Sequence, residues 1–355
     1  MCGMTVELFA RVLLRSALFT LLISGCATTQ SAVVAWPAPP AVERIRFVRT
    51  LSGEGDLEGA FARLWRKLAG DEATVRLFHP VGVAVTPGGE VVAVTDQALG
   101  QVFIFDLEHE RVHPVPKDVV GGAPVGVAFE GDRPWVVVPQ AKVALSFSRD
   151  GRPLRRVELP ECERPVGLAI DEQAGKFYVT DTSTSASAEG HVVHVYGLAS
   201  GEHEGTVGRR GEGQGELFFP TFVSLAPGGG LFVADTMNAR VQQFGSDGAF
   251  VRQFGERGDQ FGQFDKPKGI ATDSFGNVYI VDSFFSVVQI FNAEGRLLLF
   301  FGGRGDSPGF LSNPAGIAID AKNRIYVANG LNFRVDVYEL VNTRAADSTP
   351  PPPGT

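Results

Sequence analysis

The sequence is poor in cysteine, in charge and in long apolar runs, and each shortage excludes a class of protein. Its 355 residues contain three cysteines, too few for a scaffold stapled by disulfides. Charged residues make up 20% of the chain and the formal net charge is −8, so no basic excess favours contact with nucleic acid phosphates. The apolar run near the N-terminus is too short for a membrane-spanning helix. Glycine is plentiful, at 43 residues, which is typical of a turn-rich all-β protein.

The first 25 residues have the pattern of a secretory signal peptide. Arg11 and Arg15 precede a short apolar run, and small residues follow it up to Cys26. Residues 23–26, ISGC, resemble the lipobox of bacterial lipoproteins. That resemblance implies cleavage before Cys26 and lipidation of this cysteine, and Ala27 in place of Asp favours the outer membrane. The alternative is an ordinary signal peptide followed by an incidental cysteine.

Six segments of the sequence repeat one pattern, Pro-x-Gly followed by a short apolar run. The steps between them are 44, 41, 55, 47 and 47 residues, and only the fourth segment lacks the glycine, having Phe222 instead. Periods of this size indicate a repeat architecture. The segments start at Pro80, Pro124, Pro165, Pro220, Pro267 and Pro314.

Each segment is followed by further short runs rich in Val, Ile, Phe and Tyr, separated by Gly, Asp or Asn. One full repeat reads PKGIAT, NVYIVDS, VVQIFN and LLLFFGG, and runs of this kind are typical of β-strands. Four strands in each of six repeats predict an all-β fold, a six-bladed β-propeller with four-stranded antiparallel blades. No apolar period of 3.6 residues is sustained through a repeat, which excludes a helical solenoid.

The last repeat lacks its fourth strand, because the chain runs into a Pro-rich tail after residue 340. Residues 42–51, VERIRFVRTL, have strand character and precede the first blade. We predict that this N-terminal strand closes the last blade and covers its open edge. Residues 57–69 place Leu57, Phe61 and Trp65 on one helical face, so we also predict a short helix there.

The repeats resemble the NHL repeat. The matching features are Pro-x-Gly-(Val/Ile)-Ala, then Val-Ala-Asp, then Asn-x-Arg-Val-x-x-Phe, and the fullest copy is LFVADTMNARVQQFGSDGAFVRQFG. The resemblance covers residues 80–341. It implies a six-bladed propeller of the bacterial lipoprotein type, in which the activity is largely unknown.

These patterns divide the chain into four parts. We predict a signal peptide over 1–25, a lipidated Cys26 with a flexible tether over 26–41, the propeller over 42–341 and a disordered tail over 342–355. Removal of residues 1–25 changes the net charge from −8 to −9. Only Cys162 is then left as a thiol, so no internal disulfide forms, and we interpret this cysteine as structural.

The start of strand one and the end of strand two lie on the same face of a propeller. The residues before the prolines include His79, Arg164, Lys266 and Asn313, which could form a pocket for an anion or carboxylate or could be solvated loop ends. Four strand ends carry acidic residues, which could bind Ca²⁺ but serve more often as acceptors for backbone N–H groups. They are Asp96, Asp181, Asp235 and Asp282.

Other motifs carry less functional weight. A zinc site with three His ligands is disfavoured, because only His79 falls on the inner face, and His191 and His194 point to opposite faces of a strand. The tripeptide RGD occurs at 257–259 and 304–306, both times in a Gly-rich turn where glycine serves the backbone geometry.

The sequence therefore predicts a lipid-anchored, non-enzymatic module of the bacterial cell envelope that binds a protein or a small anionic ligand. We expect a monomer without a cofactor and without nucleic acid partners. The alternative is a divalent-metal-dependent lyase or lactonase that uses the central channel of the propeller. Related propellers include enzymes of both kinds.

Overall fold

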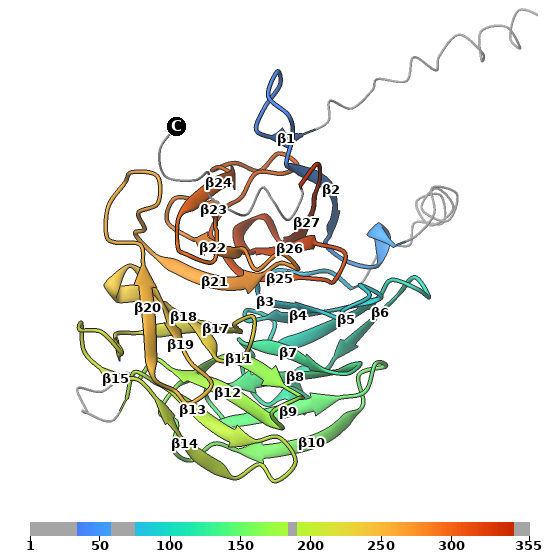
Figure 1. Cartoon of the computed structure of the whole chain (residues 1–355). Coiled ribbons are helices and arrows are strands. Elements are labelled where there is room, and N and C mark those ends of the chain that lie inside the picture. The colour runs from blue at the N-terminus through green and yellow to red at the C-terminus, as the bar shows by residue number, and fades with distance from the viewer. Residues whose placement is uncertain (1–33, 58–74, 184–189, 344–355) are drawn as a thin grey trace, which may run out of the picture. The chain divides into compact units, whose positions relative to one another are not determined.

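The computed structural model describes residues 34–57, 75–183 and 190–343 (Figure 1). In this part of the chain, six antiparallel sheets follow one another along the sequence, five of four strands and one of five. They are the blades of a six-bladed β-propeller, as the repeats predict. Each four-stranded blade is built from strands that are consecutive in the sequence, so the prediction of four-stranded antiparallel blades is confirmed.

The strands of blades 1 to 3 have the following bounds. Blade 1 contains β3 (Pro80–Val85), β4 (Val91–Asp96), β5 (Gln101–Asp106) and β6 (Arg111–Val115). Blade 2 contains β7 (Val127–Glu130), β8 (Arg133–Val138), β9 (Val143–Phe147) and β10 (Pro153–Glu158). Blade 3 contains β11 (Pro165–Asp171), β12 (Lys176–Asp181), β13 (Val192–Gly197) and β14 (His203–Val207).

The strands of blades 4 to 6 follow the same plan. Blade 4 contains β17 (Pro220–Leu225), β18 (Leu231–Asp235), β19 (Arg240–Phe244) and β20 (Phe250–Phe254), preceded by the short pair β15 (Arg209–Arg210) and β16 (Glu216–Leu217). Blade 5 contains β21 (Pro267–Thr272), β22 (Val278–Asp282), β23 (Val287–Phe291) and β24 (Leu297–Gly302). Blade 6 contains β25 (Pro314–Ile319), β26 (Arg324–Asn329) and β27 (Arg334–Leu340), completed from the N-terminal side.

The second strand of a blade is buried along its length. Every residue of β4, β18 and β22 is buried, which explains why these strands read as unbroken apolar runs instead of alternating ones. Both faces of the strand pack on neighbouring blades, and the six apolar clusters of the core consist largely of residues from two adjacent blades. The core is therefore a series of layers between blades.

The glycine of the Pro-x-Gly pattern lets neighbouring blades approach closely. A Cβ atom on Gly82, Gly126, Gly167, Gly269 or Gly316 would lie 2.1 to 2.6 Å from a carbonyl oxygen of the next blade. None of these five has a positive φ, so glycine is needed there for space and not for its dihedral freedom. Gly316 of blade 6 meets the Val81 carbonyl of blade 1, which closes the ring.

The N-terminal strand completes the last blade, as predicted. β2 (Ile45–Leu51) pairs antiparallel with β27, and the two run side by side, blue beside dark red, in Figure 1. Ile45 and Leu51 are fully buried in this position. The paired strand covers the edge that β27 would otherwise expose.

A fifth strand extends blade 6 beyond the prediction. β1 (Ala35–Trp36) pairs with β2, so the described part of the expected tether, residues 34–41, begins with ordered structure. Trp36 contacts Phe301 and Tyr338, with ring centroids 5.9 Å away in both cases. The connection between blades 1 and 2 also contains regular structure, the helix α3 (Lys117–Val120) before β7.

Several predictions fall on residues that the structure does not describe. The signal peptide, Cys26 and most of the Pro-rich tail lie outside the described residues, as does the predicted helix over 57–69 except for Leu57. Among the described helices none has the length and apolar character needed to cross a membrane.

Candidate functional site

The predicted site residues lie at one edge of each blade. The antiparallel pairing puts Pro80 opposite Asp96 and Pro267 opposite Asp282, so strand one begins where strand two ends. Blades 3, 4 and 6 show the same pairing. We call the surface formed by the loops that precede strand one and the loops that follow strand two the loop face.

The four strand-end aspartates hold the backbone of the loop face. All are buried, and each accepts N–H bonds from the residues before the proline of its own blade. Asp282 accepts from Asp265 at 2.8 Å and, on the other side, from Phe284 at 3.0 Å. A carboxylate that accepts several backbone N–H groups replaces the missing ladder bonds of a loop.

Amide side chains serve the same purpose in the two blades without aspartate. Oε1 of Gln140 accepts the N–H of Ala123 at 3.1 Å, and Oδ1 of Asn329 accepts the N–H of Ser312 at 2.7 Å. All six strand-end residues therefore have a structural role. The prediction of Ca²⁺ at Asp96, Asp181, Asp235 and Asp282 stays a prediction, with each of these carboxylates in a different blade.

The predicted basic set is spread over the loop face. Arg164 and Lys266 are exposed, while His79 and Asn313 are half-buried. No hydrogen bond or ion pair joins any two of these four side chains in the described part of the chain. The Lys266 ammonium lies 5.9 Å from the ring centre of Phe284, close enough for a cation–π contact. The four residues stay candidates for binding, placed on one face but not assembled into a pocket.

Three exposed apolar side chains occupy equivalent positions on the loop face. Met237, Phe284 and Leu331 each stand two residues after a strand-end residue, in blades 4, 5 and 6, and are 45%, 50% and 53% exposed. We call them the apolar tips. Beside them, the exposed rings of Phe78 and Phe333 stack at 5.4 Å between blades 1 and 6. Sequence reasoning missed these residues, although their shared spacing was visible.

Arginines of the next inter-blade turn fix two of the apolar tips. Arg257 donates to the carbonyl of Met237 at 2.6 Å, and Arg304 donates to the carbonyl of Phe284 at 3.0 Å. These are the arginines of the two RGD sequences, so the motif has a structural role here. These bonds hold the backbone that carries the tips, so little backbone freedom is lost there when a partner binds.

Lys268 is a further cation that the sequence reasoning passed over. It occupies the x position of Pro-x-Gly on the innermost strand β21 and is half-buried. Burial, together with the charge of nearby Lys266, lowers the pKa of Lys268 below its ordinary value. Blade 5 therefore has two lysines at the start of its first strand, more basic residues than any other blade has at this position.

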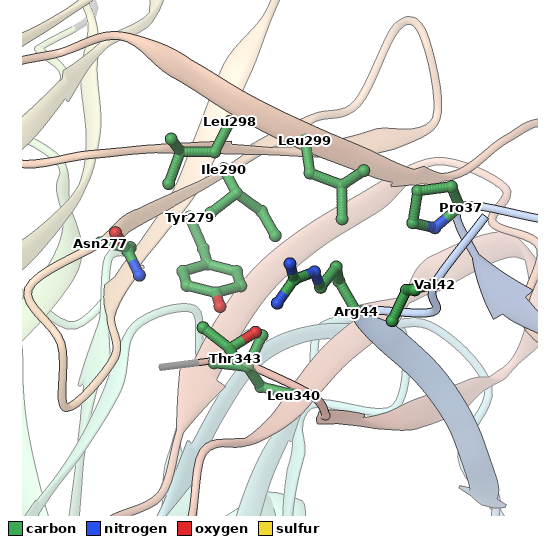
Figure 2. A pocket seen from close by; sticks show the side chains of 10 residues that line it. All are labelled: Pro37, Val42, Arg44, Asn277, Tyr279, Ile290, Leu298, Leu299, Leu340 and Thr343. Atoms are coloured by element: carbon green, nitrogen blue, oxygen red, sulfur yellow. The ribbon is translucent and has the colours of Figure 1, made fainter. Parts of the chain in front are cut away.

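A pocket of about 410 Å³ lies at the opposite end of blade 5 (Figure 2). Leu298, Leu299 and Leu340 supply apolar walls, and Arg44 and Tyr279 extend toward each other across it (Figure 2). Asn277 also lines it, and its buried Oδ1 has no hydrogen-bond partner among residues 34–57, 75–183 and 190–343. The pocket is assembled from distant parts of the sequence, so periodicity could not reveal it.

The histidines of blade 3 point to opposite faces, as predicted. The ring of His191 contacts that of Phe219 in blade 4, at 4.5 Å between centroids. His194 faces the other way, with its Nδ1 3.1 Å from Nε2 of His203. Cys162 is fully buried, and burial raises the pKa of its thiol to about 12. This protonated thiol is a poor nucleophile, in agreement with a structural role.

Comparison with known proteins supports the fold. The model of a β-propeller repeat family, SBBP, matches residues 249–281. No curated protein matches significantly. A structural genomics protein of unknown function from Bacteroides thetaiotaomicron is 16% identical, with 83% of this chain and 75% of that chain covered and a TM-score of 0.60.

Two further solved structures show how differently such a fold is used. A streptogramin B lyase is 13% identical, and the alignment covers 75% of this chain and 95% of the lyase chain, with a TM-score of 0.56. A nidogen/laminin complex contains a chain that is 15% identical, and the alignment covers 72% of this chain and 88% of that chain, with a TM-score of 0.56. At these identities the likeness concerns the fold alone. The protein is a six-bladed β-propeller, consistent with the NHL type.

Proposed function

We propose that the protein is a lipid-anchored binding module of the bacterial cell envelope, which docks a protein partner on its loop face. The observation that carries the proposal is the set of apolar tips, exposed at equivalent positions in three consecutive blades. Exposed apolar groups rimmed by polar residues are typical of interaction sites.

The charge of this face indicates the partner's chemistry. Lys266 stands beside the tip Phe284, Lys268 lies in the same blade, and the stacked pair of Phe78 and Phe333 adjoins His79. A partner segment with apolar side chains and acidic neighbours complements this surface. The chain as a whole has a net charge of −8, so the local cations favour this face over others.

The test is photo-cross-linking in the native envelope, with a photoreactive amino acid in place of Phe284 or Leu331. The matched control is Leu154 of β10, which is 53% exposed on the outer edge of blade 2. We expect a discrete adduct from the two tips but not from position 154. Lys266→Glu and Arg164→Glu should each reduce its yield several-fold. Identical adducts from all three positions, or full yield in both charge variants, would contradict the proposal.

The second candidate function is the metal-dependent lyase or lactonase. A streptogramin B lyase shares the fold over 95% of its own chain, so an enzyme of this kind can be built on such a propeller. This function requires a divalent ion held over the central channel. Metal analysis of the purified protein tests it, together with a loss of the metal when the loop-face aspartates outside blade 3, Asp96, Asp235 and Asp282, are replaced by asparagine.

A further inference from the structure

Blade 3 brings together three side chains of metal-binding type. Sγ of Cys162, a carboxylate oxygen of Asp181 and a ring nitrogen of His194 all lie within 4.8 Å of one another. The three residues are buried. They come from the loop before β11, the end of β12 and the middle of β13, so the blade itself sets their geometry. The set lies at the edge of the core between blades 2 and 3, to which Cys162 belongs.

One ring nitrogen in this set makes no hydrogen bond within the part of the chain that the structure describes. Nε2 of His194 is buried and has no hydrogen-bond partner among the described residues. It lies 3.6 Å from Oδ2 of Asp181, an ion-pair contact when the ring is protonated. Nδ1 of the same ring lies within hydrogen-bond distance of His203, at 3.1 Å. The hydrogen-bond geometry allows either tautomer: with its proton on Nε2 the ring points that proton at the carboxylate, and with the proton on Nδ1 it donates to His203 and leaves the Nε2 lone pair for a cation. A bound ion takes the place of the Nε2 proton and selects the second tautomer. Two acceptors then face each other, an arrangement that a cation between them stabilises.

The carboxylate of Asp181 has room for one more ligand. Its Oδ1 accepts the N–H groups of Arg164 and Ser183, at 2.8 and 2.9 Å. Among the described residues, its Oδ2 accepts one N–H group, that of Glu163 at 2.7 Å, and faces Nε2 of His194 at 3.6 Å. A carboxylate oxygen can accept two such contacts. The free position is therefore on Oδ2, the oxygen that faces His194.

Blades 4 and 5 have a glutamine at the position of His194. In blade 4, Gln242 takes the place of His194, and its Nε2 donates to Oδ2 of Asp235 and to the carbonyl of Glu216. In blade 5, Nε2 of Gln289 donates to the carbonyl of Gln263 at 2.8 Å. Glu216 and Gln263 each precede their strand-end aspartate by the same number of residues as Cys162. Blade 3 thus has a thiol and an imidazole at positions where its sisters have hydrogen-bonded polar residues.

We propose that blade 3 binds a zinc ion through Sγ of Cys162, Nε2 of His194 and Oδ2 of Asp181, with water as the fourth ligand. Sulfur, imidazole and carboxylate in a tetrahedral set are the ligands that Zn²⁺ takes in proteins. Binding forms the Zn–S bond as the thiol proton leaves to solvent. The thiolate and carboxylate together balance the charge of the ion, which permits its burial.

The surroundings of the site suit this assignment. His203 orients the imidazole ligand from outside, and the hydroxyl of Tyr196 lies 3.5 Å from Sγ of Cys162. A pocket of about 570 Å³ opens beside them, lined in part by Glu161, Tyr196 and His203, and provides a route for the ion and its water.

The other group of this kind in the described residues is already neutralised. Asp106, Glu108 and His109 also lie together, but the guanidinium of Arg149 donates to Asp106 at 2.7 Å and to Glu108 at 2.8 Å. A cationic side chain fills the position that an ion would take. His109 therefore supplies a control for the site in blade 3.

The test is metal binding by the full chain, purified metal-free and without an affinity tag. Titration with Co²⁺ should give one equivalent with a thiolate-to-cobalt absorption band, and Zn²⁺ should displace it. Cys162→Ser should abolish the band, and His194→Gln should weaken zinc binding at least about 100-fold. The latter variant installs the glutamine of the sister blades, so its fold should be retained. His109→Gln should bind zinc as the unaltered chain does.

Two results would overturn the assignment. One is a folded, metal-free protein that takes up no Zn²⁺ or Co²⁺ at equimolar concentration, which would leave His194 and Asp181 as a structural pair. The other is unchanged affinity in both Cys162→Ser and folded His194→Gln, which would place the bound metal elsewhere, for example over the channel as a lyase requires. If Cys162→Ser fails to fold, the zinc affinity of His194→Gln by itself tests the assignment.

Discussion

Replacement of Gly269 by alanine tests the packing between blades directly. A Cβ atom at this position would lie 2.2 Å from the carbonyl oxygen of Ala315 and 3.1 Å from both the backbone N and the Cγ2 of Ile317. Carbon and oxygen cannot approach closer than about 3 Å, so blades 5 and 6 must separate by roughly 0.8 Å. The obstacle is backbone on the innermost strand of a closed ring, and a side-chain rotation cannot relieve it. We expect a loss of about 3 kcal/mol in the free energy of unfolding, at the upper end of overpacking effects.

The assay is equilibrium unfolding in urea, with the slope m compared between variants to confirm that the same surface is exposed. Gly55→Ala is the matched control, because nothing lies within 4 Å of its Cβ position and its φ is not positive. It should change stability by less than about 0.5 kcal/mol. If Gly269→Ala costs no more than Gly55→Ala, the steric account of the Pro-x-Gly pattern is wrong.

Two further predictions concern the closing strand and the response to acid. A chain that begins after residue 51 loses Ile45 and Leu51, both fully buried. It should be less stable by at least about 4 kcal/mol, and the exposed edge of β27 should make it prone to association. A thermal melt equal to that of the full chain would refute this. Burial alone raises the pKa of Asp106, but hydrogen bonds from Arg149 and His109 outweigh it and hold the pKa below its ordinary value. This carboxylate therefore stabilises the fold above about pH 4, and its contribution is lost as the pH falls further. Arg149→Met should flatten the decline in urea midpoint between about pH 5 and pH 2, and an unchanged slope would show that the pair contributes nothing.

Local sequence was sufficient to predict the architecture. The six Pro-x-Gly segments and the short apolar runs between glycines specify strands and turns within a few residues of each other, so their number and order could be read without a structure. The closing strand followed from the same reasoning, since the last repeat was one strand short. One boundary differs: β7 begins at Val127, although the pattern starts at Pro124.

The candidate sites depended on contacts that cross the chain. The strand-end aspartates were visible in the sequence, but only the structure shows that they hold the N–H groups of the residues before each proline. The apolar tips stand at the same spacing after each strand end, and Met237 and Leu331 lie in short 3-10 turns, but the spacing alone does not show that their side chains are exposed. The pocket of Figure 2 joins Arg44 of the N-terminal segment to Tyr279 and Leu340, residues that no local pattern relates.

The sequence by itself determined the strands, the number of blades and the means of closure, because each depends on near neighbours along the chain. Only the tertiary structure decided which side chains meet. Cys162, Asp181 and His194 are separated by 19 and 13 residues, and the antiparallel pairing of β11, β12 and β13 brings them to one point. That Nε2 of His194 makes no hydrogen bond among the described residues could be recognised only in the structure, because whether a polar atom is satisfied depends on everything that packs around it.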